Sequence, residues 1–252
     1  MIEQRPAVRA GISIDSAEDG AVIVLVVRGS WNAALRTETF AALQRCLAAH
    51  PAGLVVDLTG LDDPGVLSLP AWAEVHEVSA AVDPPVRVAI CASPEMALAH
   101  RLQEAANRRH LPVFAKPRQA WSALNNLIPA ADRRVLHTPA VVHAPGRARR
   151  LIDSACRTWD LQPLLFNARL IVSELVANAV RHAGTDIRVT VLRQGGRLQM
   201  MVADADPRLP WMPTPEPGAR LISGLHMVQA VAAGWGTIAT TGGKLVWAAP
   251  RE

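Results

Sequence analysis

The sequence contains no tyrosine and few aromatic residues of any kind, since 7 tryptophans and 3 phenylalanines make up 4% of 252 residues. Proteins that stack nucleic-acid bases rely on several exposed aromatic rings, so nucleic acid is disfavoured as a partner. Cysteine is also scarce, and Cys46, Cys91 and Cys156 lack the spacing of a zinc site. An odd, scattered set of cysteines argues against a disulfide framework and predicts a reducing, cytoplasmic environment.

The sequence also lacks a long hydrophobic run. Its longest apolar stretch, residues 21–27, is far shorter than the roughly 20 residues of a membrane-spanning helix. The first fifteen residues do not contain the apolar segment of a secretory signal. We therefore expect a cytoplasmic protein that makes no use of a membrane. The hydrophobic fraction of 50% is ample for packed cores, and the length suits one large domain or two ordinary ones.

Lysine is nearly absent, because Lys116 and Lys244 are the only two and arginine supplies the remaining positive charge. Residues 1–128 carry 11 Lys+Arg against 13 Asp+Glu, whereas residues 129–252 carry 15 against 9. The basic second half suits phosphates, nucleic acid or an acidic protein, and charge alone does not choose among them.

The first half alternates between strand and helix patterns. Runs rich in β-branched residues are typical of buried strands, and helical spacing of apolar residues separates them. This alternation predicts an α/β domain over residues 1–128 with a mainly parallel or mixed sheet. The expected strands are 21–28, 53–58, 86–91 and 111–115. The expected helices are 33–49, 69–82, a segment from an N-cap at Ser93 to 109, and 117–127.

The second half follows a stretch rich in proline and arginine, residues 129–150, where we place the domain boundary near Pro129. Part of this stretch is a candidate first strand of the next domain. The pattern beyond it, over 129–252, predicts an α/β sandwich with its helices gathered on one face. The expected helices are 146–159, 163–184 and 224–233, and the expected strands are 187–193, 198–204, 235–240 and 244–249, with a loop at 207–217.

The segment ARLIVSELVANAVRHAG, residues 168–184, is the most informative. Its apolar residues form one arc of a helix, and Glu174, Asn178 and His182 form a polar stripe along the border of that arc. Asparagine is a poor helix former, so its position within a helix suggests a ligand or a local hydrogen-bond partner. The alternative is a solvated helix edge.

Two later positions suit ligand binding. Asp204 ends an expected strand and opens on a long loop, where a carboxylate is well placed to accept from an amino group; the alternative is a turn residue. Gly224 begins an expected helix, where backbone N–H groups and the helix dipole favour a phosphate; the alternative is a simple turn.

The order of these features resembles the GHKL ATP-binding superfamily, and most closely its anti-sigma-factor serine kinases. The resemblance rests on SELVANAVRHAG (173–184), VADADPRLP (202–210), SGLHMVQAVAAGWG (223–236) and GGKLVW (242–247). It implies a sandwich with a mixed, mainly antiparallel sheet that binds ATP and Mg²⁺. Glu174 would be the general base, Asn178 would coordinate Mg²⁺, and Asp204 would accept from the adenine amino group. The other nucleotide-binding positions would be Asp206, Ser223, Gly224 and Leu225.

This chain departs from the superfamily pattern at two of these places. Asp206 stands where the adenine motif carries glycine. Leu245 stands where the last hairpin carries a threonine whose hydroxyl supports the adenine aspartate.

The first half resembles an STAS domain, the fold of anti-sigma factor antagonists, over about residues 11–127. The resemblance rests on LVVDLTGLDDPGVLSL, residues 54–69. It places Asp63 where the family carries a phosphorylated serine, so that a fixed carboxylate would imitate part of the charge of phosphoserine. Ser68, nearby, is interpreted as an N-cap or a buried hydroxyl.

The two resemblances together suggest a bacterial regulator that controls a protein partner, either a sigma factor or an antagonist-like regulator. Its activity would be transfer of the ATP γ-phosphoryl group to serine or threonine, with the first domain regulating the second within one chain. The alternative is a non-catalytic scaffold that sequesters its partner, and a third hypothesis is a basic nucleic-acid binder. A homodimer is left open.

Overall fold

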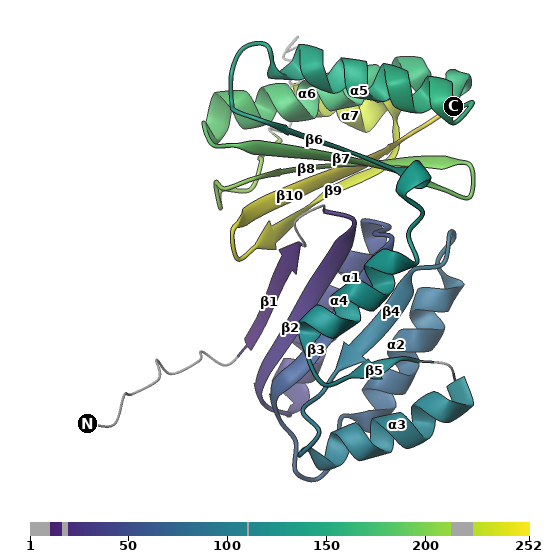
Figure 1. Ribbon diagram of the computed structural model, residues 1–252. Helices are drawn as coiled ribbons and strands as arrows, with labels where there is room; N and C mark the ends of the chain where they lie inside the picture. The colour runs from purple at the N-terminus through teal and green to yellow at the C-terminus, as the bar shows by residue number, and fades with distance from the viewer. Residues whose placement is uncertain (1–10, 17–19, 110, 213–223) are drawn as a thin grey trace.

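The structure, a computed structural model, describes residues 11–16, 20–109, 111–212 and 224–252. Figure 1 shows two β-sheets stacked along the molecule, one formed by the first half of the chain and one by the second half. The chain passes from the first sheet to the second through a short 3-10 helix, η1 (Ala130–Asp132). The division of the chain into domains 1–128 and 129–252 remains a prediction.

The first sheet has the strand order β1-β2-β3-β4-β5 and is mixed. Its first pair is antiparallel and its other three pairs are parallel. The strands are β1 (Gly11–Ser16), β2 (Val22–Ser30), β3 (Gly53–Asp62), β4 (Arg87–Cys91) and β5 (Val113–Phe114). The helices are α1 (Ala33–Ala48), α2 (Leu69–Ala81), α3 (Ala97–Arg109) and α4 (Pro117–Asn126). The predicted α/β domain with a mixed sheet is confirmed.

Two local predictions in this half were wrong. The sequence pattern did not predict β1, because it offers only six residues and its pairing with β2 is set by the sheet. The helix expected from Ser93 begins at Ala97 instead, since Pro94 and Glu95 form a turn that precedes it.

The second sheet has the order β6-β7-β8-β10-β9. All four of its pairings are antiparallel, so the expectation of a mixed sheet was wrong for the described residues. The strands are β6 (Arg133–Thr138), β7 (Ile187–Gln194), β8 (Arg197–Asp204), β9 (Ala232–Thr240) and β10 (Gly243–Pro250). The candidate strand after the boundary is thus β6. Three helices lie on one face of this sheet (Figure 1): α5 (Ala144–Thr158), α6 (Leu165–His182) and α7 (Gly224–Val231).

Helix α6, preceded by the 3-10 helix η2 (Gln162–Leu164), is the central helix of that layer. Its buried residues pack into the core between the helices and the sheet: Ala168, Ile171, Val172, Leu175, Val176 and Ala179. The segment Gln162–His182 is long and apolar enough, by length and composition alone, to cross a membrane. Because its apolar face is buried against the sheet, we interpret it as a core helix.

The opposite face of the second sheet packs against the first half of the chain. Four buried residues of this face belong to the same core cluster as the first sheet: Leu192, Met201, Ile238 and Leu245. Hydrogen bonds also cross the junction, including Gln199 Nε2 to the carbonyl oxygen of Ala49 at 2.7 Å and the N–H of Thr241 to the carbonyl oxygen of Ile14 at 2.9 Å. The two halves therefore share a hydrophobic core.

Candidate functional site

Glu174 and Gly224, two of the predicted site residues, lie in contact. Glu174 is on the edge of α6, and its carboxylate lies against the first residue of α7. A Cβ at Gly224 would push the end of the Glu174 side chain away, so the glycine allows the carboxylate to lie directly against the start of α7. A carboxylate beside a helix N-terminus is favoured by the helix dipole, which gives Glu174 a local stabilising role as well as a candidate catalytic one.

Asn178, one turn further along α6, lines a cavity of about 260 Å³. Cavities that bind small molecules usually span about 300–1,000 Å³, so this one lies just below that range. Its wall combines polar and apolar side chains: Asn178, His182, Asp206, Arg208, Leu209, Pro210, Trp211 and Lys244.

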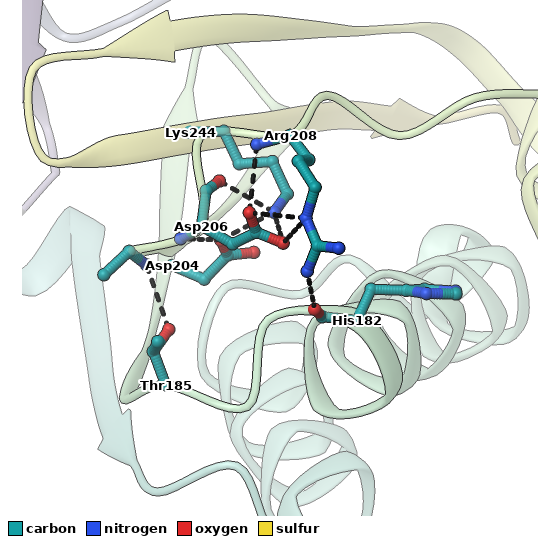
Figure 2. Close-up of polar contacts among 7 residues, drawn as sticks. His182, Thr185, Asp204, Asp206, Arg208 and Lys244 are labelled. Carbon is teal, nitrogen blue, oxygen red and sulfur yellow. Dashed lines mark hydrogen bonds and ion pairs between the residues drawn. The ribbon is translucent and has the colours of Figure 1, made fainter.

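Asp204 ends β8, as predicted, but its carboxylate is bound by the chain itself. Figure 2 shows Lys244 reaching from β10 to the carboxylate of Asp204, with Nζ 2.7 Å from Oδ1. Lys244 Nζ also donates to the carbonyl oxygen of Asp206 at 3.0 Å. Both side chains of the pair are only 2% exposed. The group that was expected to accept from an adenine amino group therefore accepts from a buried ammonium.

Gly243 makes this pairing possible. Its φ of +141° is one that other residues rarely adopt, and a Cβ there would overlap the carbonyl oxygen of Asp204. The close approach aligns Lys244 opposite Asp204 in the β8–β10 ladder. Leu245 lies opposite Ala203 instead and points into the core shared with the first domain. The expectation that Leu245 occupies the supporting position beside Asp204 was wrong, because successive strand residues face opposite sides of a sheet.

Asp206 is paired with Arg208 two residues later. The Nε of Arg208 donates to both carboxylate oxygens, at 3.0 and 3.1 Å, and its N–H donates to Oδ1 at 3.0 Å. These bonds lower the pKa of Asp206 to about 2. Arg208 Nη2 also donates to the carbonyl oxygen of His182 at 3.0 Å, which ties the loop to the end of α6 (Figure 2).

The remaining predicted residues do not complete a nucleotide site. Ser223 lies outside the described residues. Leu225 is 6% exposed and packs in the core, so only its backbone is available to a ligand. Within the part of the chain that the structure describes, no group of three or more His, Cys, Asp or Glu residues is placed to hold a metal ion. Mg²⁺ at Asn178 would thus depend on phosphate oxygens of a bound nucleotide, and both ATP and Mg²⁺ remain predictions.

Asp63, the residue at the expected phosphoacceptor position, is turned inward. Its side chain accepts from the backbone N–H groups of Leu67 and Ser68 at 2.9 and 2.8 Å, and from the Ser68 hydroxyl at 2.5 Å. The same hydroxyl accepts from Trp72 Nε1 at 2.8 Å. Asp63 therefore anchors the turn that leads into α2 and does not present a phosphoserine-like charge to solvent. Ser68 is the buried hydroxyl that the sequence suggested.

An apolar surface beside this loop was missed by the sequence reasoning. Leu67 is 72% exposed, and it follows Val66, whose φ of +55° is a strained value for a β-branched residue. Leu67 lines an open groove of about 780 Å³ together with Trp31, Arg36 and Phe40 of the β2–α1 region. The Arg36 guanidinium lies 5.8 Å from the centre of the Phe40 ring, a cation–π contact. The sequence signal for this surface was the apolar residues of GVLSL, residues 65–69, which follow a polar loop.

The three cysteines are buried and free. Burial raises the pKa of the Cys46 and Cys91 thiols to about 12 and also raises the pKa of Cys156. Since the thiolate is the reactive form, these groups are inert packing residues.

The fold and site together define a two-sheet α/β protein with a self-paired polar cavity in its second half. No family model matches the chain, and no curated protein matches it. A solved structure of an anti-sigma factor antagonist from Mycobacterium paratuberculosis is similar to it, with 17% sequence identity and a TM-score of 0.39. That similarity covers 45% of this chain and 92% of the other. At this TM-score the likeness carries no argument about function.

Proposed function

We propose that the protein is a regulator that works by binding a protein partner, with the groove beside Leu67 as its contact surface. The observation that carries this proposal is the exposed Leu67 on a fixed loop. Asp63 anchors the loop by three hydrogen bonds, and Val66 holds a strained conformation that a free loop would relax. An apolar side chain held rigidly next to a groove is typical of an interaction site, because little entropy is lost on binding.

The partner that we propose is a sigma factor or an antagonist-like regulator, the classes implied by the two resemblances. The charged residue that lines the groove is Arg36, which favours a partner with an acidic group at the contact. Partner binding in this proposal needs no nucleotide, since Lys244 already neutralises Asp204.

The experiment is a calorimetric titration of the full-length chain with purified sigma factors and antagonist-like regulators, with and without Mg-ATP. We expect one of them to bind equally well in both conditions, and Leu67→Ser to weaken that binding at least tenfold. Leu127→Ser is the matched control, since Leu127 is 55% exposed but lies outside the groove, and we expect it to change the affinity less than twofold. Equal losses in both variants would refute the contact surface.

A second candidate function is an ATP-dependent serine/threonine kinase. The contact between Glu174 and the N-terminus of α7, with Asn178 facing the cavity next to it, favours this candidate. Catalysis there would rest on positioning and charge neutralisation. It requires phosphate transfer from radiolabelled ATP to the bound partner, lost in Glu174→Ala, and Mg-dependent ATP binding, lost in Asn178→Ala. Binding of the partner without any transfer would leave the scaffold function alone.

A further inference from the structure

We propose that Lys244 is the specificity-determining residue of the second-half cavity. Its ammonium already donates to the carboxylate of Asp204, where the amino group of a ligand would otherwise donate. The cavity therefore does not select ligands that carry an amino group over ligands that lack one. The geometry consists of a direct bond of 2.7 Å to Asp204 Oδ1 and a second bond of 3.0 Å to the carbonyl oxygen of Asp206. Lys244 also lines the cavity wall, so it is the boundary between the ligand space and the carboxylate.

The strength of this contact decides which donor holds Asp204. A hydrogen bond between two charged groups is about twice as strong as one between neutral groups. A neutral amino group from a ligand would replace the stronger bond with a weaker one. It would also separate the ammonium of Lys244, which is 2% exposed, from its nearer carboxylate and leave it only the longer contact with Asp206 Oδ2 at 3.8 Å. Displacement of Lys244 by a ligand is therefore unfavourable.

The surroundings of Lys244 hold it in place. Gly243 brings the start of β10 against the turn that follows Asp204, and the N–H of Ala205 in that turn donates to Thr185 Oγ1 at 3.0 Å. The N–H of Asp206 donates to Asp204 Oδ1 at 3.0 Å, so this oxygen receives two donors from the protein. Asp206 is itself paired with Arg208. Both carboxylates near the cavity are thus satisfied within the chain.

The test compares ATP with inosine triphosphate, which differ in whether the purine carries an amino group or a carbonyl oxygen at one position. In calorimetric titrations of the wild-type chain with Mg²⁺ present, we expect the two affinities to agree within twofold or to be too weak to measure. A tenfold preference of the wild type for ATP would overturn the proposal.

Lys244→Thr is the decisive variant, because a threonine leaves space beside Asp204 and still offers a hydroxyl. We expect ATP to bind it at least tenfold more tightly than it binds wild type, without a matching gain for inosine triphosphate. Lys116→Thr, which changes the other lysine of the chain at an exposed position, is the control and should leave both affinities unchanged. A folded Lys244→Thr variant with unchanged affinity for ATP would contradict the proposal.

If Lys244→Thr does not fold alone, the same titration is followed by circular dichroism, since a ligand that binds only the folded state drives folding. Recovery of structure with ATP but not with inosine triphosphate supports the role of Lys244, and recovery with neither refutes it. The proposal is independent of partner binding at Leu67, so each can fail without the other.

Discussion

Asp63 and Asp204 lie in different halves of the molecule but invite direct comparison. Each lies at or just beyond the carboxyl end of a strand, each is 7% exposed when backbone and side chain are taken together, and each was expected to face a partner or a ligand. Both are instead satisfied by their own chain. Asp63 accepts from neutral groups four and five residues away, whereas Asp204 accepts from an ammonium 40 residues away. One carboxylate fixes a local turn, and the other depends on the register of two strands.

The two contacts differ in how much the free energy of unfolding falls when one partner is removed. The donors around Asp63 are neutral, so removal of this carboxylate would leave unpaired neutral groups, two of them buried, rather than a buried charge. The ammonium and carboxylate of the Lys244–Asp204 pair are buried together, and removal of Lys244 would leave the Asp204 carboxylate buried without its ion partner. Substitutions at the two sites should therefore differ in size.

The largest effect is expected for Lys244→Met, which leaves Asp204 buried without its ion partner. We expect the free energy of unfolding to fall by roughly 3–5 kcal/mol, measured by urea denaturation followed by tryptophan fluorescence. The double variant Asp204→Asn, Lys244→Met removes both charges and should recover more than half of this loss. A loss below about 1 kcal/mol in the single variant would mean that the pair is not buried as described.

The next effect is expected for Asp63→Ala, which removes the three hydrogen bonds that anchor the turn before α2. A buried donor left without its partner costs about 1–3 kcal/mol, so we expect a loss of stability of about 1–3 kcal/mol in urea denaturation. Asp62→Ala is the matched control, because Asp62 is exposed, and we expect it to change stability by less than about 0.5 kcal/mol. Equal losses at 62 and 63 would refute the anchoring role of Asp63.

A smaller effect tests the junction between the halves. Gln199→Ala removes a buried hydrogen bond to the carbonyl oxygen of Ala49 and should cost about 1 kcal/mol in urea denaturation. Arg197→Ala removes the ion pair with Asp83, whose two side chains are 58% and 80% exposed, and should cost between about 0 and 1 kcal/mol. A larger loss for the arginine variant would contradict this order.

The smallest expected effect is a change in titration. The pKa of Asp206 is lowered to about 2 by Arg208, so the stabilising contribution of this pair is complete above the usual value of about 3.9 and is lost as the pH falls towards 2. In Arg208→Gln we expect the pKa of Asp206 to rise towards the usual value, measured by NMR titration of its carboxyl carbon. An unchanged pKa would show that another group holds Asp206 ionised.

Most elements of the fold could be predicted, because apolar periodicity is a local property of the sequence. Residues that depend on long-range pairing could not. The motif Gly-Gly-Lys was noticed, but the supporting position beside Asp204 was assigned to Leu245, since the alignment of β10 with β8 decides which residue faces the carboxylate. Among the candidate site residues, Glu174 and Gly224 lie in contact, and their roles remain predictions.

The shared core between the halves was also not predicted, although the sequence carried a signal for it. In β8 and β10, the residues on both faces are apolar, as in MMV and LVW, which is typical of strands buried on both sides. This packing bears on the hypothesis that the first half of the chain regulates the second half. The first half packs on the helix-free face of the second sheet, away from α6 and α7 (Figure 1). The residues that line the cavity all belong to the second half.

Lys244 and Leu245 are consecutive residues, yet one holds a carboxylate on the helix side of the sheet and the other is embedded beneath the first half of the chain. A shift of β10 by one residue would exchange these two surroundings. The charge of Lys244 would then lie in the hydrophobic core between the halves, and the Leu245 side chain would lie against the carboxylate of Asp204. The strand is thus locked in place from both sides. A ligand in the cavity and a movement at the junction between the two halves would therefore both act on the backbone of Lys244 and Leu245.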